Sequence, residues 1–256
     1  MLADFLLAAA FTTFVWFFAT GAILWLNRLP REFHEGALVA ATPALALGTC
    51  GLIVSAPETS ASGAYLAFLS AILIWGWHEL SFLLGVVTGP NRAPLPPGLP
   101  LLARFCASAG TVIHHEIALA ATLLAMILLS WGAPNQVGPL TFGILFAMRL
   151  STKLNIFLGV SNLSTDMLPD HLSYLKSHFR QAPMNPLFPL SLLACTGLLL
   201  WLGRQAFTDA GAALLLSLAF LGLVEHGFMM LPIRDSALWK WAMPRKQQTF
   251  MNGKDA

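Results

Sequence analysis

The sequence predicts an all-α fold: a polytopic membrane helix bundle of about seven transmembrane helices. Composition and the spacing of apolar runs both support this prediction. Of the 256 residues, 57% are hydrophobic and only 10% are charged, and the mean hydropathy is +0.70. A soluble domain carries about 25% charged residues. Apolar runs of about 20 residues, the length that crosses a bilayer as a helix, recur along the chain. Because lipid offers no hydrogen bonds to an exposed backbone, these runs must be helices.

The apolar runs give one integral membrane domain over residues 1–256. The first run begins without the basic segment of a signal peptide and continues to Leu26, so we expect it to be retained as a span. The second and sixth runs are short, which allows tilted or partly re-entrant helices. The predicted spans cover residues 5–26, 37–55, 63–87, 105–131, 138–160, 186–203 and 207–231.

Lys and Arg are distributed unequally between the two sets of connections. With seven spans, eleven of the 14 basic residues lie in the loops after the first, third and fifth spans and in the C-terminal tail. Arg204 is the single basic residue in the opposite loops. Cytoplasmic loops carry the excess of Lys and Arg. The sequence therefore predicts an N-terminus outside and a C-terminus in the cytoplasm.

Two connections on the predicted cytoplasmic side have a recognisable character. Residues 88–100 contain five prolines, which favour a semi-rigid extended segment. Residues 165–181 predict an amphipathic helix, which we expect to pack on the bundle more readily than on headgroups or on a partner. After it, Asn185 is a predicted helix cap and Pro186 a predicted first helical residue.

A set of polar and charged residues lies inside the predicted spans. Its members are His78, Glu79, His114, His115, Glu116, Arg149, Lys153, Asn155, Glu225 and His226. Counted from the cytoplasmic ends at about 1.5 Å per residue, they lie at similar depths of roughly 8 to 16 Å. The simplest interpretation is one shared polar layer in the cytoplasmic half of the bilayer.

Energetics excludes leaving this layer in contact with lipid. A central charge costs roughly 2.5–3.5 kcal/mol on insertion scales, so five would cost on the order of 15 kcal/mol. That cost matches the whole stability of a typical fold, roughly 5–15 kcal/mol. Arg149 and Lys153 share one helix face, and we expect them to pair with two of the three glutamates, with Asn155 as a further partner.

The residues leave three interpretations of the layer open. It is a satisfied network that fixes helix register, a site where histidine holds a metal or tetrapyrrole, or a proton or substrate pathway. His114 and His115 point about 100° apart on a helix, so they cannot face one site equally. Glu-x-x-His pairs and His-Glu-x-x-His motifs are absent from the sequence. No named catalysis follows, and the net charge of +2 does not indicate nucleic acid.

Four stretches resemble one known family. They are WGWHELSFLLG, HHEIAL, the long block over residues 149–191, and EHGFMMLP. Together they are similar to the photosynthetic complex assembly protein family of purple phototrophic bacteria, the PuhE type, whose members are integral membrane proteins encoded with reaction-centre genes. The resemblance covers nearly the whole chain and brings no established catalytic residues with it.

The resemblance implies an assembly factor in the bacterial inner or intracytoplasmic membrane, in contact with lipids and with reaction-centre and antenna polypeptides. A sharper hypothesis is that His78 or His115 binds the magnesium of a bacteriochlorophyll. The alternative is a metal-dependent integral membrane enzyme acting on a pigment or lipid precursor, with Glu79, Glu116, Glu225 and His226 supplying ligands for a divalent metal ion or acid–base groups. An enzyme is the less expected of the two, and a transporter is a third possibility.

Overall fold

The computed structural model describes residues 1–163, 165, 167–232 and 235–242. Within these ranges the regular structure is helical, apart from one isolated bridge between Val160 and Gln181. The α-helices are α1 (Leu2–Leu26), α2 (His34–Ser55), α3 (Ala61–Leu83), α4 (Leu101–Ala109), α5 (Ile113–Leu129), α6 (Val137–Leu158), α7 (Leu187–Gly203) and α8 (Ala210–Phe228). The 3-10 helices are η1 (Arg31–Phe33), η2 (Asp170–His178) and η3 (Asp235–Trp239).

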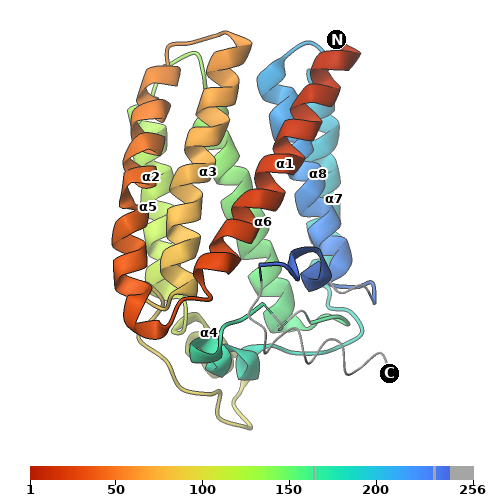
Figure 1. Ribbon diagram of the computed structural model, residues 1–256. Helices are drawn as coiled ribbons and strands as arrows, with labels where there is room; N and C mark the ends of the chain where they lie inside the picture. The colour runs from red at the N-terminus through yellow and green to blue at the C-terminus, as the bar shows by residue number, and fades with distance from the viewer. Residues whose placement is uncertain (164, 166, 233–234, 243–256) are drawn as a thin grey trace.

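The long helices run side by side along one axis, and α1 crosses the bundle obliquely (Figure 1). Helices α2, α3 and α5 form one group and α1, α7 and α8 form another. Helix α6 contacts α3, α5, α7 and α8 and so joins the two groups. Helices α3 and α8 form the interior of the bundle. In their apolar 18-residue stretches 61% and 56% of the residues are buried, against 17% in α1 and in α2.

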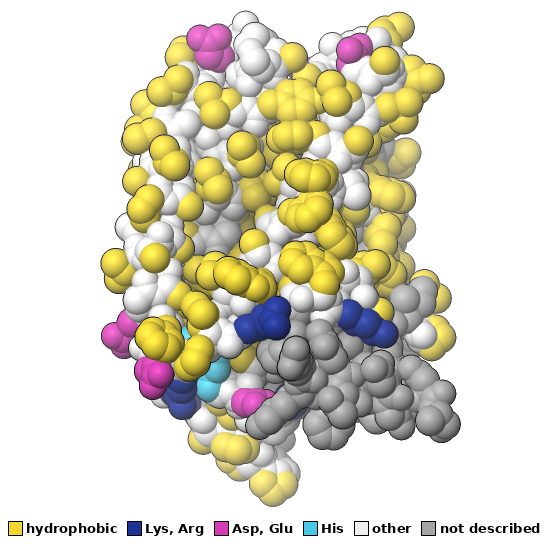
Figure 2. All heavy atoms as spheres, viewed as in Figure 1, with side chains coloured by type: hydrophobic (Ala, Val, Ile, Leu, Met, Phe, Trp, Pro, Cys, Tyr) yellow, Lys and Arg dark blue, Asp and Glu magenta, His cyan; other side chains and the backbone are white. Residues whose placement is uncertain are grey.

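The helices have the length and composition of membrane spans. Five of them are long and apolar enough to cross a bilayer, and α4 with α5 adds a sixth if that bent pair is one span. Helix α7 is apolar but has only 17 residues. Hydrophobic side chains cover most of the height of the visible face (Figure 2). The length and apolar composition of these helices are those of a multi-pass membrane protein.

Small residues let neighbouring helices approach closely, as is usual where lipid supplies no hydrophobic drive for association. A Cβ placed on Gly48 of α2 would lie 2.8 Å from the Ser70 carbonyl oxygen of α3, and one on Gly51 would lie 2.3 Å from Ser70 Oγ. A side chain at Gly48 would force α2 and α3 apart, whereas one at Gly51 would require the Ser70 side chain to rotate. In the interior, Phe68 of α3 packs with Leu214 and Leu218 of α8.

The predicted span at 105–131 is wrong as a single helix. Helices α4 and α5 meet at an angle of 67°. Backbone from the proline-rich connection fills the break, since Thr88 O accepts from His115 N at 3.0 Å and Gly110 O accepts from Asn91 N at 3.0 Å. A Cβ on Gly89 would lie 2.2 Å from the Gly110 oxygen, so only glycine fits there. His115 therefore lies in the first turn of α5 and not ten residues into a span.

The predicted amphipathic helix over 165–181 is also wrong in type and length. The structure has a 3-10 helix, η2, over Asp170–His178, while residues 164 and 166 lie outside the described residues. Side chains three residues apart share a face of a 3-10 helix. Leu172, Leu175 and His178 are accordingly the buried ones, and the two leucines pack on Phe82 of α3.

The start of α7 lies one residue later than the sequence predicts. Asn185 Oδ1 accepts hydrogen bonds from Leu187 N at 2.9 Å and Phe188 N at 3.1 Å, so it satisfies two free amides of the first turn. Pro186 precedes the helix, which begins at Leu187.

Basic side chains gather at one end of the bundle, the lower end in Figures 1 and 2. The connections at the opposite end hold Arg204 together with Glu58 and Asp209. The described basic residues at the lower end are Arg28, Arg31, Arg92, Arg104, Lys176, Arg180 and Lys240.

Candidate functional site

Five of the predicted polar residues form one group between α3, α5 and α6. Arg149 Nη2 donates to Glu79 Oε2 at 2.9 Å, and His115 Nε2 lies 3.7 Å from Glu79 Oε1. Lys153, one turn along α6 from Arg149, pairs with Glu116 of α5. Each base thus meets one carboxylate. The two ion pairs tie α6 to α3 and to α5 within the apolar part of the bundle.

His78 faces away from these ion pairs toward α5. Its Nε2 lies 2.9 Å from Thr122 Oγ1, and its ring is buried. His115 is fully buried, with its ring centroid 4.8 Å from that of Phe82. Both imidazoles are therefore enclosed by protein side chains.

His226 and Asn155 belong to a second group, between α6, α7 and α8. His226 Nε2 lies 2.9 Å from Ser151 Oγ, and Asn155 Nδ2 donates to Ser191 Oγ at 3.0 Å. Asn185 Nδ2 donates to Asn155 Oδ1 at 3.1 Å. The partners of Asn155 are therefore hydroxyl, amide and backbone groups, and not the charged side chains expected from the sequence.

Besides His78, two further predicted residues stand apart from both groups. His114 is exposed on α5. Glu225 of α8 accepts a hydrogen bond from Trp16 Nε1 of α1 at 2.9 Å. The single polar layer expected from the sequence is thus divided: one group on each side of α6, with Glu225 facing α1 and His114 outside the bundle.

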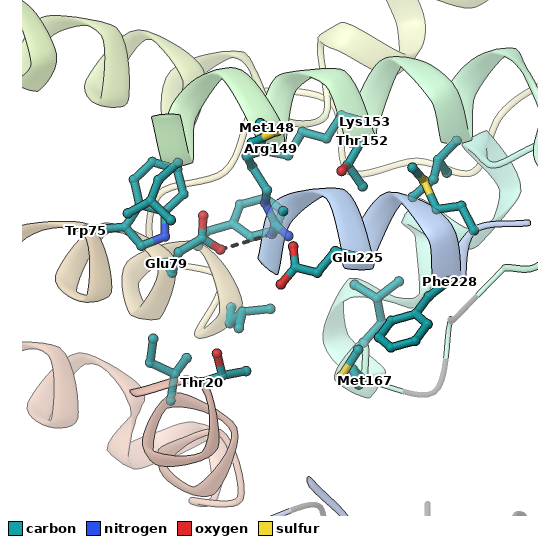
Figure 3. A pocket seen from close by; sticks show the side chains of 18 of the residues that line it. Thr20, Trp75, Glu79, Met148, Arg149, Thr152, Lys153, Met167, Glu225 and Phe228 are labelled. Atoms are coloured by element: carbon teal, nitrogen blue, oxygen red, sulfur yellow. Dashed lines mark hydrogen bonds and ion pairs between the residues drawn. The ribbon is translucent and has the colours of Figure 1, made fainter. Parts of the chain in front are cut away.

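A cavity of about 440 Å³ lies beside the first group, between α1, α3, α6 and α8. Arg149 reaches into it from α6 toward Glu79, and Glu225 enters from α8 (Figure 3). Its walls are mostly apolar, with Trp75 of α3 and Phe228 of α8 among them. The segment before and within η2 and Trp239 of η3 lie against its lower part.

Much of this cavity has no signal in the sequence. Trp16 and Thr20 line it from α1, which carries no charged residue near them, and Met167 and Trp239 come from connections. These residues look like ordinary lipid-facing or interfacial residues in the sequence. Only the fold shows that α1 leans across α3 and α8 and closes a space there.

The described residues do not assemble a metal centre. Within that part of the chain, no three His, Cys, Asp or Glu side chains lie close enough to share one ion. His178 is the one histidine among the described cavity residues. Its ring nitrogens lie 3.0 Å from Ser108 Oγ and 3.1 Å from the Ala93 carbonyl oxygen. An axial imidazole for a magnesium pigment is therefore not presented to the cavity, and the ligand set of the metal-enzyme alternative is dispersed.

Comparison with known proteins places the chain in a family. The family described as "Protein of unknown function (DUF3623)" matches residues 2–250. The chain is also 45% identical over 248 residues to a Rhodobacter capsulatus protein described as "Uncharacterized 30.4 kDa protein in puhA 5'region", and this match covers 93% of the chain and 90% of that protein. No solved structure matches the chain. The matched residues include every described helix, and the chain therefore belongs to the DUF3623 family.

Proposed function

We propose that this protein is a membrane assembly factor for the photosynthetic reaction centre and its light-harvesting antenna. The sequence resembles an assembly family encoded with reaction-centre genes, and the Rhodobacter capsulatus relative is described by its position in the puhA 5' region. The proposed partners are membrane lipids and reaction-centre and antenna polypeptides, in the bacterial inner or intracytoplasmic membrane.

One observation favours a binding protein over a catalyst. The charged groups of the first group are paired with each other, Arg149 with Glu79 and Lys153 with Glu116, while a large and mostly apolar cavity lies beside them. A catalytic acid or base has to reach the group that it protonates or deprotonates. Groups closed into ion pairs are instead suited to hold the walls of a binding site in place.

We extend the proposal to seven crossings with the basic end in the cytoplasm. Helix α5 and the short α7 lie alongside the longer helices of the bundle, and α4 lies at its lower end, at 67° to α5 (Figure 1). The end that gathers Arg28, Arg92 and Lys176 then faces the cytoplasm, in agreement with the positive-inside rule.

The proposal does not include ligation of bacteriochlorophyll by His78 or His115. Neither ring lines the cavity, and His78 Nε2 is already occupied by Thr122. If pigment passes through this protein, the contacts are made by the cavity walls and not by these imidazoles.

Deletion of the gene in a phototrophic bacterium tests the proposal. In the deletion strain we expect loss of the reaction-centre and antenna absorption bands from the membranes while pigment synthesis continues. In a strain that carries a tagged copy of the protein, we expect reaction-centre polypeptides to copurify with it. Accumulation of one pigment precursor would instead indicate an enzyme and contradict the proposal. Complementation should fail with the double variant Glu79→Gln, Arg149→Met and succeed with Arg204→Gln, a matched charge removal at the far end of the bundle.

A further inference from the structure

We propose that the cavity binds an uncharged amphiphile, with its apolar body between the aromatic walls and a hydrogen-bond-accepting oxygen at the guanidinium of Arg149. This inference rests on the proposed function in that it names the ligand of the same cavity. The ligand class is a lipid-like molecule that ends in an ester, keto or hydroxyl oxygen.

The charges around the cavity argue against an ionic head group. Arg149 and Lys153 both line it, and each is already paired with a carboxylate, Glu79 and Glu116 respectively. An anion that shared the guanidinium of Arg149 or the ammonium of Lys153 would lie close to the carboxylate already paired with that base, and the two negative charges would repel each other beside a mostly apolar cavity. A cation at Glu79 would lie close to the positive charge of Arg149 and would be repelled by it. A neutral group meets neither repulsion.

Arg149 keeps donors available for such a neutral group. A guanidinium has five N–H donors, and the described residues accept one hydrogen bond from Arg149, at Glu79 Oε2. Its Nε is buried, whereas Nη1 has no hydrogen-bond partner in the described part of the chain and is not buried, and 35% of the side chain is exposed. Figure 3 shows this side chain extending from α6 into the cavity. An oxygen acceptor there would satisfy a donor that the fold leaves unpaired and would keep the ion pair intact.

The remaining walls suit an apolar body. Trp75, Ile144, Leu221 and Phe228 line the cavity from three helices. The volume of about 440 Å³ falls in the range of small-molecule sites, roughly 300–1,000 Å³. Membrane lipids and pigment intermediates both offer a neutral oxygen on an apolar chain, so this chemistry is shared by two sources.

Tryptophan quenching by brominated amphiphiles measures this binding in purified full-length protein. Three of the eight tryptophans line the cavity, namely Trp16, Trp75 and Trp239. The probes are the methyl ester of dibromostearic acid, dibromooctadecane, dibromooctadecyl sulfate and a dibromooctadecyl trimethylammonium salt. We expect saturable quenching by the ester at about tenfold lower concentration than by the hydrocarbon or either ion.

A matched pair of glycine variants tests the location. A Cβ on Gly76, which lines the cavity, would have Ile23 Cδ1 at 3.9 Å as its nearest neighbour, whereas Gly197 on α7 has nothing within 4 Å. Gly76→Leu should fill the cavity and abolish the saturable phase, and Gly197→Leu should retain it. Retained saturable binding in Gly76→Leu would overturn the proposed location.

The head-group contact is tested by removing both charges at once. Glu79→Gln combined with Arg149→Met leaves no unpaired charge, and it should reduce the preference for ester over hydrocarbon without changing hydrocarbon binding. Equal binding of ester and hydrocarbon by the wild-type protein, or tighter binding of either ion, would overturn the inference. Ester binding without a deletion phenotype would overturn the assembly role alone, and a deletion phenotype without ester binding would overturn this inference alone.

The two possible sources are separated by extraction. Organic extracts of protein purified from pigment-making and pigmentless strains are compared by mass spectrometry. A neutral lipid in both strains identifies a membrane lipid, and a neutral species present only in the pigment-making strain identifies a pigment intermediate. An anionic species retained in the wild-type protein and lost in Gly76→Leu would contradict the inference.

Discussion

Glu79 is 8% exposed and depends on its neighbours for its charge to be tolerated in the bundle. Arg149 donates to one oxygen at 2.9 Å, and His115 lies 3.7 Å from the other. Removal of one member of such a pair costs more than removal of both, because the remaining charge stays buried and unpaired. This asymmetry gives a test that does not depend on function.

We predict that Arg149→Met lowers the free energy of unfolding by roughly 2–5 kcal/mol. The double variant Glu79→Gln, Arg149→Met should recover much of this loss, since no charge is then left alone. Thermal or denaturant unfolding in one detergent measures both. Arg204→Met is the control and should stay within about 0.5 kcal/mol of wild type. A double variant as unstable as Arg149→Met would contradict the pairing.

His171 of η2, outside the spans, provides a pH-dependent contact at the lower end. Partial burial lowers its pKa, and repulsion from His34 and Arg31 acts in the same direction, while its contact with the Leu83 carbonyl oxygen at 2.8 Å and the charge of Asp170 oppose the shift. The folded state therefore favours the neutral ring. Its contribution to stability is present above the unfolded-state pKa of about 6.5 and is lost as the pH falls below that value.

The measurement is thermal unfolding of wild-type protein and His171→Gln at about pH 7.5 and about pH 5.5. The wild-type protein should lose more stability on acidification than the variant, because the variant cannot bind the proton. The same loss in both proteins would show that other groups set the pH dependence.

The residue types of the site are visible in the sequence, but their partners are not. Arg149 and Lys153 are four residues apart, so their common face follows from helix geometry alone. His226 has an intramembrane position much like that of Glu79, yet it belongs to the other side of α6, next to Ser151. Serine side chains are too common in helices to have predicted that contact. Which polar residues meet depends on helix rotation, which the sequence alone does not define.

At the scale of elements, the contact of η3 and the following residues with α1 depends on Gly21. A Cβ at this position would lie 2.4 Å from Trp241 Cζ2. Trp239 is buried nearby, and its Nε1 donates to the Phe17 carbonyl oxygen at 3.0 Å. Gly21 thus leaves room for the segment that lies against the lower part of the cavity.

We predict that Gly21→Ala displaces the half-exposed ring of Trp241 and loosens the contact of residues 235–242 with α1. Limited trypsin digestion should then cut after Lys240 faster than in the wild-type protein, and tryptophan emission should shift to longer wavelength as Trp239 becomes hydrated. Gly197→Ala is the matched control, since nothing lies within 4 Å of its Cβ position. Unchanged cleavage in Gly21→Ala would contradict the tight contact.

Elements were predictable from the sequence where apolar length alone defined them. Helices α1, α2, α3, α6 and α8 lie within a few residues of their predicted spans. The break between α4 and α5 was not predictable, because it depends on Thr88 and Asn91 from a different part of the chain bonding to the backbone there. The 3-10 geometry of η2 was missed for a related reason, since its leucines fit both a 3.6-residue and a 3-residue repeat.

At the scale of the whole molecule, the uneven charge of the two ends gives a prediction for topology. In a cysteine-free background, Glu58→Cys marks the upper end and Arg92→Cys the lower end, and both positions are exposed. A membrane-impermeant maleimide should label Glu58→Cys on cells with a permeable outer membrane, and Arg92→Cys only after the inner membrane is opened. The reverse pattern would contradict the proposed orientation.

Helix α6 is the element on which both polar groups converge. Arg149 and Lys153 bond toward α3 and α5, while Ser151 and Asn155 bond toward α7 and α8. Because α3 and α5 precede α6 along the chain, the two carboxylates that pair with its bases are synthesised before it. The two bases of α6 therefore pair with helices that are made before it, and its hydroxyl and amide groups bond to α7 and α8, which are made after it.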